Sequence, residues 1–379
     1  MKVLFIQNIA AIAGSEKYFL QLLPKLKDHN IDVHFYNFYL KENKELALEF
    51  NNLLQELNIP VYGCETNSYV SLKVLFNIKS TIGREKFDIV HSHLVYSDFL
   101  VSLVKLISRF DFKLVSTLHG YQEDLYFKYC LKPKKMPKTL YYYIMKFSFS
   151  KMDGVYACSY GLKNFFKQIG LQPKSEIEVI HHGFDYAPIE KEKLKSLKFG
   201  SPQLLIVGRL VKRKGHHFVL KNLDMLLKMY PSLQLIIAGN GELEEEIMLQ
   251  IKEYQLKNHV KMLGYRKDTL ELMAASDVIL VPSYAEGLPL VIFEAFHSGT
   301  PVVAFDTIGC NEGIEHEFSG LLARPFNGRD FLDKVESILE NTPISKKFSI
   351  QAKENLFSKF SKGRMVKNTI AFYKRQLAS

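Results

Sequence analysis

The chain has 379 residues, of which 47% are hydrophobic and 24% are charged, an ordinary globular composition with room for two hydrophobic cores. Its formal net charge of +10 suits an anionic partner, such as nucleic acid, acidic lipid or a phosphorylated substrate, or serves solubility alone. The four cysteines form no Cys-x-x-Cys pair, which argues against a disulfide framework or a zinc knuckle and favours a reducing cytosol.

The first half of the chain alternates apolar runs with amphipathic stretches. Residues 3–6 indicate a strand rather than a signal peptide, and a helix interrupted by Pro24 follows. The next strand is expected at 33–38 and the next helix at 46–57. Further strands are expected at 88–91, 113–118, 154–158 and 178–181. This β-α-β rhythm predicts a parallel sheet covered by helices. The sequence contains no run of about 18 uncharged apolar residues, so no membrane-spanning helix is expected.

A charged stretch, Glu190 to Lys198, separates the two halves. It ends in Gly200-Ser201-Pro202, so we place a linker between residues 184 and 202. Strands then resume at 204–208, 233–238, 260–263, 278–281 and 302–305. The sequence therefore predicts an α/β fold with two Rossmann-like, doubly wound domains, an N-terminal domain at 1–185 and a C-terminal domain at 200–362.

The most informative stretch follows the strand at 278–281. A loop leads to a helix that is expected to begin near Pro289, a residue favoured at the first helical position, and to end at Gly299. A helix N-terminus at the carboxyl end of a parallel strand is where such sheets bind ligands, and its N–H groups suit phosphate.

Two carboxylates, Glu286 and Glu294, bracket the start of this helix. Eight residues of helix span roughly 12 Å, whereas the carboxylates of glycosidases lie about 5 to 9.5 Å apart. The spacing better fits two hydroxyl-binding groups with a diphosphate between them, the layout of a nucleotide sugar. Taken alone, a pair of acids at this spacing would be interpreted as incidental surface acids.

Two cations follow the first strand of the second domain. Gly208 and Arg209 end that strand and Lys214 comes five residues later, in the loop where a diphosphate would need fixed positive charge. Two solvated basic residues are the plainer alternative for this pair considered alone.

Together these residues resemble the retaining GT-B glycosyltransferases of family four, also called glycosyl transferases group 1. The resemblance covers the second domain, in order. Its motifs are G-R-L…K-G at 208–215, A-G-N-G at 238–241, L-G-Y at 263–265, A-S-D at 275–277, P-S-x-x-E-G-L-P at 282–289, E-A at 294–295, G-T-P-V-V-A at 299–304, Glu312 and S-G-L-L at 319–322.

The resemblance implies a role for each matching residue of the donor site. Arg209 and Lys214 would hold the donor diphosphate and offset its charge as the nucleotide leaves, so that no metal is needed. Glu286 would bind the transferred sugar and Glu294 the ribose. The backbone near Tyr265 and Arg266 would receive the base. Phosphate would lie against the backbone of Gly287, Leu288, Pro289 and Leu290.

The first domain resembles the family more weakly. Gly14 and Ser15 stand where the family has a glycine-rich loop near the donor phosphates, but only one glycine of the usual pair remains. His119 follows the strand at 113–118, where the family has a histidine that faces the donor sugar; a core or surface histidine is the alternative. His91 and His93 would share one side of a strand, as a metal pair requires, but no third ligand is evident.

Two further segments match the family's domain connections. Residues 181–185, His-His-Gly-Phe-Asp, resemble its P-N-G-x-D turn with two histidines in place of Pro and Asn. In the family the C-terminal helix crosses back onto the first domain, and we expect the same of residues 363–379.

Residues 126–151 hold seven lysines, no acid and many aromatic side chains. This composition suits the surface of an anionic membrane, although a solvated loop followed by a packed helix would also explain it. No nucleic-acid-binding module is visible, so nucleic acid is not expected as a partner.

The sequence thus predicts a glycosyltransferase that uses a nucleotide sugar, with uridine diphosphate as the expected carrier. The expected acceptor is a glycan, a lipid-linked glycan or a cell-wall or capsule polymer, at the inner face of the cell membrane. A nucleotide-sugar epimerase of the same fold and a non-catalytic sugar-nucleotide-binding protein remain alternatives. A dinucleotide dehydrogenase is disfavoured, because Glu244 stands at the third glycine position of its fingerprint.

Overall fold

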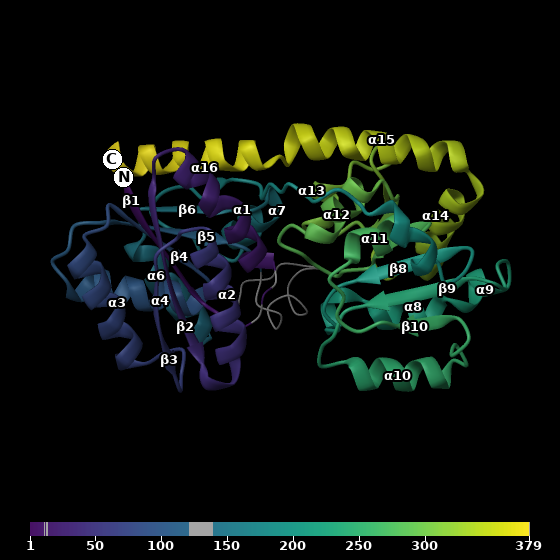
Figure 1. The fold of residues 1–379 in the computed structure, drawn as a ribbon, viewed down its shortest axis with the longest axis horizontal. Helices are drawn as coiled ribbons and strands as arrows, with labels where there is room; N and C mark the ends of the chain where they lie inside the picture. The colour runs from purple at the N-terminus through teal and green to yellow at the C-terminus, as the bar shows by residue number, and fades with distance from the viewer. Residues whose placement is uncertain (11, 13, 121–138, 379) are drawn as a thin grey trace. The chain divides into compact units, whose positions relative to one another are not determined.

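The computed structural model describes residues 1–10, 12, 14–120 and 139–378 (Figure 1). They divide into two compact units. Apart from residues 121–138, the first unit holds Met1–Asp185 and Phe360–Ser379, and the second unit holds Tyr186–Lys359. The C-terminal segment therefore belongs to the same unit as the N-terminus.

The first unit is a seven-stranded parallel sheet in the order β3-β2-β1-β4-β5-β6-β7. Its strands are β1 (Lys2–Asn8), β2 (Asp32–Leu40), β3 (Val61–Thr66), β4 (Ile89–His93), β5 (Lys113–Leu118), β6 (Gly154–Ala157) and β7 (Glu178–Val179). Its helices are α1 (Gly14–Asp28), α2 (Lys44–Glu56), α3 (Leu72–Glu85), α4 (Val95–Ile107), α6 (Leu140–Lys151), α7 (Tyr160–Gln168) and α16 (Lys362–Ala378), with a 3-10 turn η1 (Lys41–Asn43).

The inner strand β1 shows why strands of this sheet can be predicted from continuous apolar runs in the sequence. Val3, Leu4, Phe5 and Ile6 are all fully buried, because β1 lies between β2 and β4 and is covered on both faces. A parallel strand in this position is apolar at successive residues rather than at alternate ones.

The C-terminal helix α16 is part of the core of the first unit. Figure 1 shows α16 beside α1, and the two helices are in contact. The ring of Phe372 lies 5.1 Å from that of Tyr156, and the Tyr373 hydroxyl lies 2.6 Å from Nδ1 of His91. At the start of the helix, Lys362 forms an ion pair of 2.8 Å with Asp185.

The second unit is a six-stranded parallel sheet in the order β10-β9-β8-β11-β12-β13. Its strands are β8 (Gln203–Val207), β9 (Gln234–Ala238), β10 (Val260–Met262), β11 (Val278–Val281), β12 (Val302–Phe305) and β13 (Leu321–Ala323). Its helices are α8 (His216–Asn222), α9 (Asp224–Leu227), α10 (Glu244–Glu253), α11 (Thr269–Ala274), α12 (Leu290–Ser298), α13 (Cys310–Gly313), α14 (Gly328–Glu340) and α15 (Thr342–Lys359), with 3-10 turns η2 (Lys191–Leu197) and η3 (Lys212–Lys214).

The strand order of the second sheet identifies where a ligand would bind. From β8 the chain runs outward to β9 and β10, then returns to add β11 on the other side of β8. The carboxyl ends of β8 and β11 are therefore the point at which the strand order reverses, and open α/β sheets bind ligands at such points.

The structure corrects three expectations about local structure. Pro24 lies inside α1 and does not interrupt it. The strands β3 and β13 had not been predicted. The boundary between the two units, after Asp185, falls within the predicted interval 184–202, but residues 186–202 belong to the second unit and are not a separate linker. Leu197 is buried there, and Lys198 forms an ion pair of 2.6 Å with Asp277.

Among the described residues, no helix is both long enough and apolar enough to cross a membrane. Of the basic aromatic segment at 126–151, residues 126–138 lie outside the described part of the chain, and 140–151 form α6.

We predict that replacing Phe372 by Ala destabilises the first unit by about 3–5 kcal/mol, because a fully buried aromatic ring is lost from its core. Leu377→Ala in the same helix is the matched control, since Leu377 is 41% exposed. Thermal unfolding followed by circular dichroism would measure both. Equal shifts in Tm for the two variants would show that α16 does not contribute to the core.

Candidate active site

A buried carboxylate lies at the point where the strand order of the second sheet reverses. Glu286, in the loop after β11, is 6% exposed. Its Oε1 lies 2.7 Å from Nζ of Lys214 and its Oε2 lies 2.9 Å from an Nη of Arg213. Both cations come from η3 in the loop after β8, so the two loops that meet at the reversal point are joined by ion pairs.

These ion pairs keep Glu286 ionised. Burial alone would raise the pKa of its carboxyl group. The positive charges of Lys214 and Arg213, with hydrogen bonds from Lys214 and Ser283, outweigh burial and lower that pKa to about 2. The side chain is therefore a carboxylate at every physiological pH, able to accept hydrogen bonds from hydroxyl groups.

Backbone contacts hold the Glu286 loop on both sides. The Tyr284 N–H donates to the carbonyl of Arg213 at 2.8 Å, and the Glu286 N–H donates to the carbonyl of Ile308 at 3.1 Å. The hydroxyl of Thr307 donates to the carbonyl of Ser283 at 2.8 Å. The loop is thus fixed between the segments that follow β8 and β12.

Two glycines allow the loops to approach this closely. Gly215, which ends η3 with φ at +71°, would place a Cβ 2.1 Å from the carbonyl oxygen of Pro282. Gly309, with φ at +83°, would place a Cβ 2.4 Å from the carbonyl oxygen of Glu286. Any larger residue at either position would push the Glu286 loop away from its neighbours.

The helix that follows the Glu286 loop is α12, as expected. Pro289 caps it, and Gly299 ends it in the left-handed conformation. The first N–H groups of an α-helix have no partners within the helix. The four residues whose backbone is predicted to lie against phosphate lead into the first turn of α12: Gly287, Leu288, Pro289 and Leu290.

Glu294, one turn inside α12, is 7% exposed. Its neighbour is Tyr186, whose pKa is raised well above its usual value by burial and by the negative charge of Glu294. The predicted roles of these residues toward a donor stay predictions.

Of the other residues predicted to contact the donor, Arg209 and Tyr265 are exposed, and Gly208 and Arg266 are half-buried. Gly208 and Arg209 follow β8, but Arg209 is exposed, and no described residue forms an ion pair with it. Tyr265, beyond β10, is 65% exposed. Arg266 forms a bidentate ion pair with Asp268, at 2.8 and 2.5 Å. The structure therefore brings together Lys214 and Glu286, whereas Arg209, in the same loop as Lys214, forms no ion pair with Glu286 or any other described residue.

In the first unit, His119 belongs to a buried group of aromatic rings. Its Nε2 lies 2.7 Å from Nδ1 of His93, and its ring lies 5.1 Å from those of Tyr18 and His182. Burial lowers the pKa of His119 to about 3, so the imidazole is neutral at physiological pH. His91 instead bonds Tyr373 and Thr117, and within the described residues no three metal-binding side chains are grouped to hold an ion.

The loop between β1 and α1 holds the other two predicted residues of the first unit. Gly14 opens α1, and the hydroxyl of Ser15 accepts a hydrogen bond of 3.1 Å from Nε2 of Gln7, a buried residue of β1. The side chain of Gln7 also bonds the carboxylate of Glu16. The loop is thus anchored to the carboxyl end of β1.

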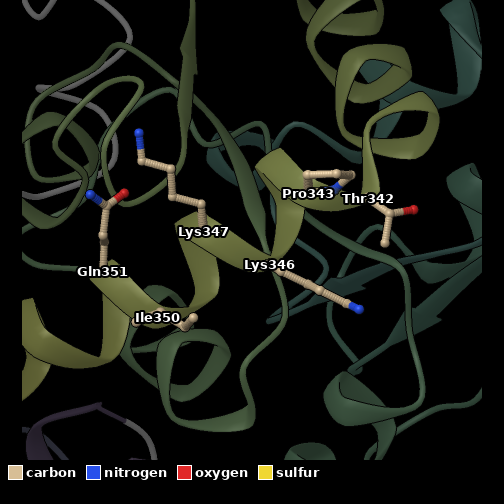
Figure 2. Close-up of a pocket in the computed structure, with 6 residues that line it drawn as sticks. All are labelled: Thr342, Pro343, Lys346, Lys347, Ile350 and Gln351. Atoms are coloured by element: carbon tan, nitrogen blue, oxygen red, sulfur yellow. The ribbon is translucent and has the colours of Figure 1, made fainter.

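A pocket elsewhere in the second unit contains none of the predicted residues. It has a volume of about 450 Å³ and lies along the first turns of α15 (Figure 2). Its two cationic side chains, Lys346 and Lys347, point to opposite sides of the helix in Figure 2 and do not converge on one position. The pocket therefore offers no focused charge for an anionic ligand. It is lined by Thr342, Pro343, Lys346, Lys347, Ile350 and Gln351.

Comparison with known protein families assigns both units. Residues 12–187 match the family described as Glycosyltransferase Family 4, and residues 189–355 match Glycosyl transferases group 1. The chain belongs to the group 1 glycosyltransferases. The resemblance of the sequence motifs to the group 1 glycosyltransferases is confirmed, and with it the GT-B fold of two Rossmann-like domains, whereas the retaining mechanism stays a prediction.

Among the relatives of this glycosyltransferase is UDP-Gal:alpha-D-GlcNAc-diphosphoundecaprenol alpha-1,3-galactosyltransferase of Escherichia coli. The two are 26% identical over 360 residues, which is 91% of this chain and 89% of the relative. An O-antigen biosynthesis glycosyltransferase, WclY of Escherichia coli, is 28% identical over 66% of this chain and 69% of its own.

Solved structures show the same fold. Anabaena Alr3699/HepE, crystallised with UDP and glucose, superposes with a TM-score of 0.81 at 22% sequence identity, covering 99% of this chain and 100% of that one. The lipopolysaccharide outer core galactosyltransferase WaaB superposes with a TM-score of 0.71 at 17% identity, covering 99% and 100% of the two chains.

Sequence reasoning missed two residues of these sites. Arg213 contacts Glu286 directly but belongs to no motif, and only its place beside Lys214 could have indicated it. His182 was noted as a departure from the family turn, but its contact with His119 carries no signal in the sequence.

We predict that Gly309→Ala displaces the Glu286 loop. The positive φ alone costs about 1–2 kcal/mol for a residue with a Cβ, and the clash with the Glu286 carbonyl adds to this. Gly170→Ala is the matched control, because Gly170 has φ at +75° but nothing within 4 Å of its Cβ position. We expect a larger fall in Tm for Gly309→Ala, and weaker nucleotide binding in that variant alone. Equal behaviour of the two variants would argue against the tight packing of the loop.

Proposed function

We propose that the protein is a retaining glycosyltransferase that moves a sugar from a UDP-sugar to a glycan or lipid-linked acceptor in cell-surface polysaccharide synthesis. The observation that carries this proposal is the ionised Glu286, held by Lys214 and Arg213 at the carboxyl ends of β8 and β11 and followed directly by the N-terminus of α12. In a nucleotide sugar, a carboxylate can bind the sugar hydroxyls, positive charge can bind the diphosphate, and a second carboxylate can bind the ribose hydroxyls. Glu286, the nearby cations and Glu294 offer these groups in the same order.

The donor diphosphate would lie between the β8 loop and α12. Lys214 and the exposed Arg209 supply positive charge, and the first N–H groups of α12 supply hydrogen-bond donors. These groups stabilise the charge that develops on the departing diphosphate, so we propose that no metal ion is required. The binding of UDP and glucose by HepE, a protein of the same fold, supports uridine diphosphate as the carrier.

Transfer breaks the bond between the anomeric carbon and the diphosphate oxygen and forms a bond from that carbon to an acceptor oxygen. The proton of the acceptor hydroxyl passes to the departing phosphate oxygen, so that charges balance. Retention of configuration follows if the acceptor attacks from the face that the diphosphate leaves. Glu286 is ionised, but its charge is balanced by two cations, so it is a poor nucleophile that can still accept hydrogen bonds from sugar hydroxyl groups. This supports a role in binding the sugar rather than in forming a covalent intermediate. In the first unit, His119 is the candidate to contact the sugar or the acceptor.

The acceptor proposal draws on the relatives. The first is named as acting on an undecaprenyl-diphosphate-linked sugar, and the second is named for O-antigen synthesis. A capsule or other surface polymer is the corresponding product class. A place at the cytoplasmic face of the membrane follows from such an acceptor.

Exposed side chains of the first unit support contact with an anionic membrane. Leu140 and Tyr143, in the first turn of α6, are 77% and 52% exposed, and Leu72 and Phe76, at the start of α3, are 72% and 57% exposed. Both helices contact α4, and neither has an acidic residue in its first turn. Apolar and aromatic side chains at helix N-termini without acids suit a surface of acidic lipid headgroups.

We predict that Lys214→Ala and Glu286→Gln each lower the rate of sugar transfer by about 10²- to 10³-fold, the usual effect of removing one group that stabilises developing charge or holds the reacting sugar. Lys221→Ala is the control, because Lys221 is an exposed cation of α8 outside the site. Transfer from radiolabelled nucleotide sugars would be measured together with Tm. Near-normal transfer in both variants would remove the assignment of this site.

We further predict that UDP stabilises the protein more than ADP or GDP. Ligand at about 100 times its Kd adds about 2.7 kcal/mol to the free energy of unfolding, and differential scanning fluorimetry would detect the shift in Tm. Because Arg209 and Lys214 supply the positive charge, the rate of transfer should not change when EDTA is added. A rate that falls with EDTA and recovers with Mg²⁺ or Mn²⁺ would show that a metal takes part.

A further inference from the structure

Arg213 and Lys214 hold opposite sides of one carboxylate. Lys214 approaches Oε1 and Arg213 approaches Oε2, at 2.7 and 2.9 Å. Arg213 has further links to the same loop: its guanidinium lies 3.5 Å from the carbonyl of Ala285, and its own carbonyl accepts the Tyr284 N–H at 2.8 Å. Arg213 is therefore attached to the Glu286 loop independently of Lys214.

The two cations differ in what they can do when an anion arrives. The lysine ammonium is a compact charge on a flexible stem with three donors, so it can turn from one acceptor to another. The planar guanidinium of Arg213 makes two contacts with the Glu286 loop, one with Oε2 of Glu286 and one with the carbonyl of Ala285, and its backbone carbonyl makes a third. A diphosphate bound at the start of α12 would compete with Glu286 for Lys214.

A buried carboxylate that loses its only cation is costly, because an unpaired charge in a site of low polarity is strongly destabilised. Glu286 has two cations, so one can leave without exposing it to that cost. We propose that Arg213 is the positioning residue that keeps Glu286 ionised and oriented toward the sugar when Lys214 turns to the donor diphosphate. This inference rests on the proposed function of the site.

Among the described residues, the groups other than Lys214 that act on Glu286 or lie beside it carry no positive charge that could replace Arg213. Ser283, in the same loop, donates a hydrogen bond but carries no charge. Cys310, at the start of α13, is a neutral thiol, because burial and the negative charge of Glu286 raise its pKa to about 12. The negative charge of Asp306, beyond β12, also acts on Cys310. Without Arg213, the pKa of Glu286 would therefore rise once Lys214 had moved to the diphosphate.

The test compares wild type, Arg213→Ala and Arg213→Lys, with Lys212→Ala as the matched control because Lys212 is an exposed cation of the same 3-10 turn. For Arg213→Ala we expect kcat to fall about tenfold to a hundredfold at pH 7, as for other losses of orientation at a reacting centre. The Kd for UDP, measured by calorimetry, should change by less than about threefold.

The pH profile of kcat distinguishes positioning from a merely structural role. Glu286 must be ionised to act, so activity is lost as pH falls through its pKa, and a raised pKa moves this loss to higher pH. We expect the acid limb of Arg213→Ala to lie at least about one pH unit above that of wild type, and Arg213→Lys, which keeps the charge, to restore most of kcat and of the acid limb. Lys212→Ala should match wild type in every measurement.

Two results would overturn the inference. One is an Arg213→Ala variant with the acid limb of wild type, whether or not its kcat or Tm has fallen. The other is a loss of UDP affinity as large as the loss of kcat, which would make Arg213 a phosphate ligand. A wild-type protein that neither binds UDP nor transfers sugar from any nucleotide sugar would instead refute the proposed function, so the two failures are distinguishable.

Discussion

The ion pairs of Glu286 determine how the candidate donor site is built. A carboxylate that is 6% exposed is stable as an ion only where cations face it, and here Lys214 and Arg213 do so from a different loop. Removing one partner of such a group costs more than the pair contributes, because the other charge stays buried. The loops after β8 and β11 are therefore tied to each other through a group whose charge the proposed mechanism also requires.

The fold supplies this group with its position. Reversal of strand order between β8 and β11 brings two loop ends to one edge of the sheet, and Gly215 and Gly309 let backbone segments pass within contact distance. The same segment then begins α12, so the carboxylate and the helix N-terminus are adjacent along the chain. A site that pairs carboxylate, positive charge and helix N-terminal N–H groups follows from this local geometry, and membership of the group 1 glycosyltransferases supports the donor-binding role that we propose for it.

Much of this could be predicted from the sequence, for definite reasons. Strands such as β1 are covered on both faces and show continuous apolar runs, whereas β13 has only three residues and β3 includes a glycine and polar residues, so neither gives a clear pattern. Pro24 lacks only one helical hydrogen-bond donor, and the buried face of α1 outweighs that loss.

The candidate site also contains residues that could be predicted from the sequence and residues that could not. Lys214 and Glu286 stand at motif positions, but in the run Lys212-Arg213-Lys214 the sequence does not tell which cations face the carboxylate. A 3-10 turn points successive side chains in directions about 120° apart; here Lys212 is exposed, and Arg213 and Lys214 contact Glu286. The tertiary fold alone decides this, as it does for the contact of His182 with His119.

A crystal structure of the protein with UDP bound would test the central claim most directly, by measuring which cations contact the diphosphate and which contact Glu286. We expect diphosphate oxygens within hydrogen-bond distance of Lys214 and Arg209 at the start of α12, with Arg213 still in contact with Glu286. UDP bound at another place in the second unit, or bound here with Lys214 and Glu286 both remote from it, would contradict the proposed donor site.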